Sequence, residues 1–108
     1  MSNSSDSRWP DNITFIPAAA DDFLALDRSR QIQVAKAIVK VASNPYPQPR
    51  GYGKPLGREL TGYLKIKLRD AGIRIIYRLE PPDSNQMRVV IIGMRSDDEV
   101  YEDVFKRI

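Results

Sequence analysis

The most informative residues of this sequence are basic side chains at alternating positions, a pattern that can bind anionic groups. Between positions 63 and 78 the chain has a single acidic residue, Asp70, and the basic residues Lys65, Lys67, Arg69, Arg74 and Arg78. Clustered cations bind phosphate groups and can stabilise negative charge that develops in a transition state. The pattern therefore indicates a site for a polyanion, with nucleic acid as the first candidate.

The residue types that are missing narrow this chemistry. The chain has no cysteine and no histidine, which excludes disulfides, thiolate nucleophiles, thiolate metal sites and catalysis by imidazole. If the protein is an enzyme, its acid and base must come from Lys, Arg, Tyr, Asp or Glu. We predict neither a metal site nor a cofactor.

The cations fall on a predicted β-hairpin, because apolar and basic residues alternate on both sides of Asp70-Ala71-Gly72. With Ala71 and Gly72 as the two loop residues, Arg69 should lie opposite Arg74, and Lys65 opposite Arg78. One face then holds the apolar side chains of Leu64, Ile66, Leu68, Ile73, Ile75, Tyr77 and Leu79. The opposite face holds the cations, and because facing like charges destabilise a sheet, an anionic partner would stabilise it.

A plainer interpretation of the basic face stays open. The cations could be solvated, or they could pair with acidic side chains from elsewhere in the chain. The stretch from Asp97 to Asp103 carries only acidic charges and could supply such partners. The formal net charge of +3 is too small to decide between nucleic acid and this alternative.

The rest of the sequence predicts a small α+β protein. Residues 1–12 are predicted to be a disordered lead-in, and residues 13–108 a single domain. We expect a strand at 13–16 and two helices within 18–42, with a break near Asp27 to Ser29, where both residues are plausible helix caps. A loop rich in proline and glycine should follow at 44–62, then the hairpin, a strand at 87–94 buried on both faces, and a helix at 97–108. Together these predict an antiparallel sheet of about four strands, with the two N-terminal helices packed on it and a short C-terminal helix. Neither a secretory signal nor a membrane span is evident, so we expect a cytoplasmic protein.

Several motifs resemble those of the RelE/ParE-type toxins of bacterial toxin–antitoxin pairs, and the RelE branch most closely. The stretch Tyr63-Leu64-Lys65-Ile66-Lys67-Leu68-Arg69, with Gly72, Arg74 and Tyr77, is similar to the central hairpin of that family. The segment before the hairpin, Lys54-Pro55-Leu56, also resembles the family. So do three segments near the end of the chain: Gly93-Met94-Arg95, Glu99-Val100-Tyr101 and Val104-Phe105-Lys106-Arg107-Ile108. Met94 stands where the family often has lysine, which removes one cation.

The resemblance implies a metal-independent endoribonuclease that cuts messenger RNA in the ribosomal A site, through attack by the RNA 2′-hydroxyl. By position, the catalytic residues would be Lys65, Lys67, Arg74, Arg95 and Tyr101. Lys67 would be the base, because neighbouring cations favour the neutral form of a lysine. Lys65 and Arg74 would stabilise the phosphorane, Arg95 would assist the leaving oxygen, and Tyr101 would stack on a base or orient the ribose. Further contacts to RNA or antitoxin would come from Lys54, Arg69 and Arg78.

The implied partners are a cognate antitoxin, the ribosome and messenger RNA, with operator DNA reached only through the antitoxin and no membrane. Two alternatives share the fold. One is a ParE-like toxin that acts on DNA gyrase without cutting RNA. The other is a catalytically weak toxin that serves mainly as an antitoxin-bound corepressor. The complete basic set and the late tyrosine favour the nuclease over the gyrase toxin.

Overall fold

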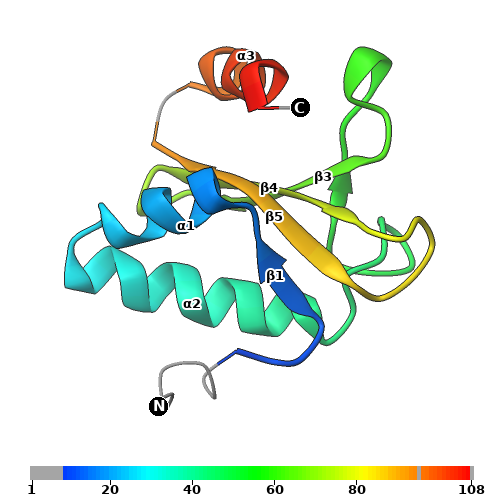
Figure 1. Ribbon diagram of the computed structural model, residues 1–108, viewed down its shortest axis with the longest axis horizontal. Coiled ribbons are helices and arrows are strands. Elements are labelled where there is room, and N and C mark those ends of the chain that lie inside the picture. The colour runs from blue at the N-terminus through cyan, green and yellow to red at the C-terminus, as the bar shows by residue number, and fades with distance from the viewer. Residues whose placement is uncertain (1–8, 95, 108) are drawn as a thin grey trace.

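A five-stranded sheet lies between two layers of helix in the computed structural model, which describes residues 9–94 and 96–107 (Figure 1). The elements are β1 (Ile13–Phe15), α1 (Pro17–Leu24), α2 (Arg28–Ala42), β2 (Lys54–Pro55), β3 (Tyr63–Leu68), β4 (Ile73–Leu79), β5 (Met87–Gly93) and α3 (Asp97–Arg107). The strand order is β1-β5-β4-β3-β2. α1 and α2 pack on one face of the sheet and α3 on the other.

This architecture confirms the predicted α+β class, with two N-terminal helices on the sheet and one short helix at the C-terminus. The sheet is mixed, because β1 runs parallel to β5 while the other pairs are antiparallel. A fifth strand, β2, forms inside the proline- and glycine-rich loop. No helix in the described ranges is long and apolar enough to cross a membrane.

The two N-terminal helices begin where local chemistry favours a helix start. Pro17 occupies the first turn of α1, where its missing N–H costs no helical hydrogen bond. Asp27 caps α2, because its carboxylate accepts a hydrogen bond from the backbone N–H of Arg30 at 2.8 Å. This confirms the predicted break. α2 then buries Val34 and Ile38 against the sheet.

The hairpin register differs from the prediction by two positions. Lys67 lies opposite Arg74, and Lys65 opposite Ile76, so the predicted pairs Arg69–Arg74 and Lys65–Arg78 are wrong. The connection is longer than two residues: it spans 69–72 and closes with a hydrogen bond from the N–H of Gly72 to the carbonyl of Arg69. Gly72 has φ +69°, which a glycine adopts without strain. Because side chains alternate with period two, a shift of two leaves the apolar and basic faces unchanged.

The face of the sheet opposite α1 and α2 has an apolar area formed by Tyr63, Ile76, Val90 and Ile91, and α3 packs on it. A β-bulge in β5 places Ile91 opposite Ile76 and Val89 opposite Tyr77. The extra residue, Val90, therefore joins Ile91 under α3 instead of pointing to the other face. The run 89–92 is buried on both faces of the sheet, as predicted.

Candidate active site

Lys65 is buried beneath α3, with only 7% of its surface exposed. Its ammonium donates a hydrogen bond of 2.9 Å to the hydroxyl of Tyr101 and lies 5.6 Å from the centre of that ring. The strand places the side chain on the α3 face, and the helix brings the tyrosine over it. The structure thus joins two predicted site residues that are far apart in the sequence.

Lys67 and Arg74 form the open part of the same face. They lie directly opposite each other on β3 and β4, and the Lys67 side chain is exposed. Lys67 is two positions from Lys65 on one strand, so their backbones are roughly 7 Å apart. Lys54 and Lys65 are a second like-charged pair, directly opposite each other on β2 and β3. Such pairs repel unless an anion or another acceptor lies between them.

Arg95 lies outside the described residues. The next residue, Ser96, caps α3 by reciprocal contacts with Glu99. Its hydroxyl donates to the Glu99 carboxylate at 2.9 Å and accepts a longer contact of 3.5 Å from the Glu99 N–H. These contacts help to set where α3 starts and therefore where Tyr101 contacts Lys65.

A pocket of about 480 Å³ opens beside the Lys65–Tyr101 contact. Its walls come from the β2 region, the turn before β3 and α3, and they include Lys54, Leu56, Lys65, Tyr101 and Phe105. Phe105 is 43% exposed at this opening. Lys54, predicted to contact RNA or antitoxin, is thus brought next to the predicted catalytic residues.

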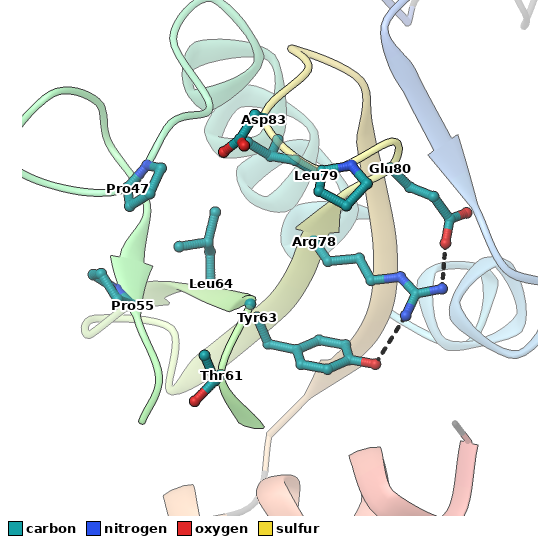
Figure 2. Close-up of a pocket in the computed structure, with 11 residues that line it drawn as sticks. Pro47, Pro55, Thr61, Tyr63, Leu64, Arg78, Leu79, Glu80 and Asp83 are labelled. Carbon is teal, nitrogen blue, oxygen red and sulfur yellow. Dashed lines mark hydrogen bonds and ion pairs between the residues drawn. The ribbon is translucent and has the colours of Figure 1, made fainter. Parts of the chain in front are cut away.

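The other two predicted contact residues lie at opposite ends of the hairpin. Arg69 is exposed in the loop 69–72, close in sequence to Lys67. Arg78 lies at the far end of β4, roughly 13 Å from Arg74 by strand rise. Its guanidinium bonds the hydroxyl of Tyr63 at 3.1 Å and forms an ion pair with Glu80 (Figure 2).

Arg78 therefore lines a different pocket from the predicted catalytic residues. This pocket has a volume of about 400 Å³ and is largely apolar, with Pro47, Pro55 and Leu64 on its walls (Figure 2). The sequence placed Arg78 on the correct face, but α3 and the length of β4 separate it from Lys67.

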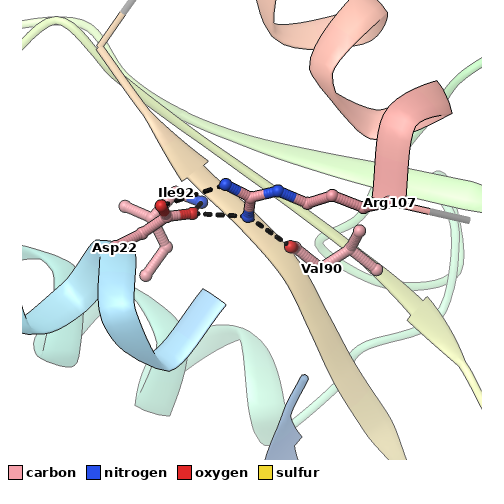
Figure 3. A network of polar contacts seen from close by, with 4 residues as sticks. All are labelled: Asp22, Val90, Ile92 and Arg107. Carbon is pink, nitrogen blue, oxygen red and sulfur yellow. Dashed lines mark hydrogen bonds and ion pairs between the residues drawn. The ribbon is translucent and has the colours of Figure 1, made fainter. Parts of the chain in front are cut away.

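One polar network was absent from the sequence prediction. Asp22 of α1 accepts hydrogen bonds from both terminal nitrogens of Arg107 at 2.7 and 3.1 Å, and from the N–H of Ile92 at 3.1 Å (Figure 3). Arg107 also donates to the carbonyl of Val90 at 3.0 Å. The network anchors the end of α3 to β5 and α1, and no local pattern around Asp22 signals it.

The described site suits an anion better than a metal ion. Within 9–94 and 96–107, no group of three or more His, Cys, Asp or Glu side chains could hold a metal ion. Lys65 instead presents its ammonium to the Tyr101 hydroxyl, and Lys67 and Arg74 add two cations to the same face of the sheet. Such an arrangement can bind a phosphate and stabilise added charge on it.

Comparisons with known proteins find solved structures that share this fold. No family model and no curated protein matches the sequence, but several solved structures do. The isolated RelE toxin of Escherichia coli is 26% identical and has a TM-score of 0.64; the match covers 88% of this chain and 95% of that one. A double arginine-to-alanine mutant of E. coli RelE, solved with a peptide of the antitoxin RelB, is 28% identical over 89% of this chain and 95% of that one, with a TM-score of 0.64.

A third structure, the RelBE2 toxin–antitoxin complex of Mycobacterium tuberculosis, shares the fold. It is 23% identical over 82% of this chain and 95% of that chain, with a TM-score of 0.61. The matches to E. coli RelE extend over almost the whole of that toxin. The residues that resemble the family lie in the hairpin and in the closing segment. In its fold, and in the residues of the hairpin and the closing segment, the chain is therefore similar to the RelE-type toxins of toxin–antitoxin pairs.

Proposed function

We propose that this chain is a toxin, an endoribonuclease that cuts messenger RNA in the ribosomal A site and so stops translation. One observation best supports the proposal. Lys65, Lys67 and Arg74 share the α3 side of the hairpin, and Tyr101 contacts Lys65 there. These are the described members of the set expected from the resemblance, and Arg95 completes it from outside the described residues. The site would act without a metal or cofactor.

The proposed reaction breaks one phosphodiester bond without added water. The Lys67 amine takes the proton of the 2′-hydroxyl, and the 2′-oxygen attacks the neighbouring phosphorus. The bond to the 5′-oxygen then breaks, and that oxygen takes up a proton, with Arg95 assisting. The products are a 2′,3′-cyclic phosphate and a 5′-hydroxyl.

Lys65 and Arg74 stabilise the phosphorane in this proposal. Their charges flank Lys67, one along the strand and one across it. Tyr101 orients the ribose or stacks on a base, and its bond to Lys65 fixes the position of the ring. Arg69 and Lys54 extend the positive surface on both sides.

The partners in this proposal are the ribosome with its message, and a cognate antitoxin. The support for an antitoxin is that solved relatives are complexes with RelB. Operator DNA would be reached only through that antitoxin. We propose the cytoplasm as the site of action, because translating ribosomes are found there.

The test is to induce the chain in cells and map the 5′ ends of messages on translating ribosomes. We expect new ends within A-site codons, and their loss in Lys67→Ala and Arg74→Ala. Lys36→Ala is the matched control, because Lys36 is an exposed lysine of α2 that lines no described part of the site. Phe in place of Tyr101 should retain more cleavage than Ala, since the ring remains.

Other outcomes would identify the alternatives. Growth arrest with intact messages and damaged DNA would contradict the nuclease and favour a toxin of gyrase. Intact messages, undamaged DNA and repression with the antitoxin would favour a corepressor.

A further inference from the structure

A groove runs between α2 and the edge of β3 that β2 leaves uncovered. β2 pairs only with Leu64 and Lys65, so the edge of β3 beyond Lys65 has no neighbouring strand in the described sheet. The groove has a volume of about 440 Å³. Its floor is apolar, with Ala37 and Val41 from α2 and Ile66 and Leu68 from β3.

The charged groups of this groove have one sign. Those that line it are Lys40, Lys54, Lys65, Lys67 and Arg69. Lys40 comes from α2 and the others from the strands and the hairpin loop, so the fold gathers cations from three places. No aspartate or glutamate is among the lining residues. An anionic ligand would lower the repulsion between these groups.

Tyr52 gives the groove an aromatic surface as well. Its side chain is 46% exposed, and the ammonium of Lys40 lies 5.3 Å from the centre of the ring. The backbone beneath it is held in place, because its N–H donates to the carbonyl of Asn44 at 3.0 Å. The next residue, Gly53, is buried against the Tyr77 hydroxyl. An exposed aromatic ring among lysines, beside an apolar floor, has the features of a single-stranded nucleic acid site.

We propose that this groove binds a nucleotide of the RNA substrate next to the cleaved linkage. The base lies against Tyr52, and its phosphate lies among Lys40, Lys54 and Arg69. The proposal rests on the proposed function, because Lys65 and Lys67 line both the groove and the candidate active site. An acidic peptide would match the charges but would make no use of the exposed ring.

The first test measures the binding of a single-stranded RNA to the purified toxin, with 2′-O-methyl groups so that it cannot be cut. Tyr52→Leu should weaken binding by roughly tenfold, since one stacked base is lost, and Tyr52→Phe should bind like the wild type. Lys40→Gln should reduce the salt dependence of log K by about 0.7, as expected for one lost phosphate contact. Lys36→Gln removes the same charge from the same helix outside the groove and should leave that dependence unchanged.

In the binding assays, the proposal for the groove would be overturned by unchanged affinity in Tyr52→Leu, by an equal effect of Lys36→Gln and Lys40→Gln, or by weaker antitoxin binding with unchanged RNA binding. The last would make the surface a protein site. A ribosomal cleavage assay separates the two proposals. If Tyr52→Leu cleaves messages with an unchanged KM, the proposal for the groove is refuted and the nuclease proposal stands. If RNA binding requires Tyr52 but the toxin leaves messages intact, the nuclease proposal is refuted and the groove proposal stands.

Discussion

Asp22 and Arg107 connect the first helix to the last, although 85 positions separate them in the sequence. The side chains are only 20% and 23% exposed, and the contact is bidentate. Asp22 also accepts the N–H of Ile92, and Arg107 donates to the carbonyl of Val90. The position of α3, and with it that of Tyr101, therefore depends on a carboxylate in α1.

Removing this carboxylate should loosen α3. In Asp22→Ala the Arg107 guanidinium and the Ile92 N–H both lose their acceptor, so we expect about 2 kcal/mol less stability against unfolding in urea. Hydrogen exchange of the α3 amides should quicken more than that of α2. Asp21→Ala is the control, because Asp21 is an exposed neighbour on the same helix. Equal losses in the two variants would show that the network adds nothing.

Gly53 leaves room for the hydroxyl of Tyr77. A Cβ at position 53 would lie 2.3 Å from that oxygen, which itself donates to the Pro45 carbonyl at 2.8 Å. Gly53→Ala should therefore destabilise the protein strongly, by roughly 2 kcal/mol or more. In a Tyr77→Phe background the same change should cost clearly less. Additive effects in this double-mutant cycle would contradict the close approach.

The same tyrosine predicts how stability changes at high pH. Burial removes the phenolate from water and raises the pKa of Tyr77 well above the usual tyrosine value. An acid whose pKa is raised in the folded state stabilises the fold below its unfolded pKa, about 10 for tyrosine, and this stability is lost at higher pH. Urea unfolding between pH 8 and 11 should show a shallower decline in Tyr77→Phe than in wild type. Tyr52→Phe, at an exposed tyrosine, should decline like wild type.

The facing cations predict a conflict between stability and activity. Lys67→Gln removes one charge of the Lys67–Arg74 pair, so we expect a gain of about 0.3 kcal/mol in stability, larger at low salt. The same variant should lose RNA cleavage. Thermal unfolding at two salt concentrations measures the first effect, with Lys36→Gln as reference. A loss of stability would mean that Lys67 has favourable partners that outweigh the repulsion.

The two faces of the hairpin could be read from the sequence because side chains alternate with a period of two along a strand. This rule places Lys65, Lys67 and Arg74 on one face, even though the loop is longer than the two residues predicted. The pairing register was harder to predict, because it depends on the conformation of the loop. The same sequence is compatible with a two-residue loop and with a longer loop that ends in a left-handed Gly72. Asp27 was found because a capping residue acts within its own turn.

No comparable pattern in the amino-acid sequence indicates the contacts between distant segments. Nothing in the hairpin sequence shows that α3 packs on Tyr63 and Ile76, where it covers part of the basic face and buries Lys65. Asp22 and Tyr52 act through partners on other elements, so their neighbours in the sequence say little about them. The apolar positions of the last helix indicate that it packs on another element. Only the fold shows which face of the sheet it covers.

The strand order has a consequence for synthesis of the chain. β1 pairs with β5, and Asn12 donates to the carbonyl of Asn85, 73 positions later. β1 therefore has no strand to pair with until β5 has left the ribosomal exit tunnel. Tyr101 and Arg107 follow β5 in the chain, so the contact between Lys65 and Tyr101 forms only after α3 has been synthesised as well.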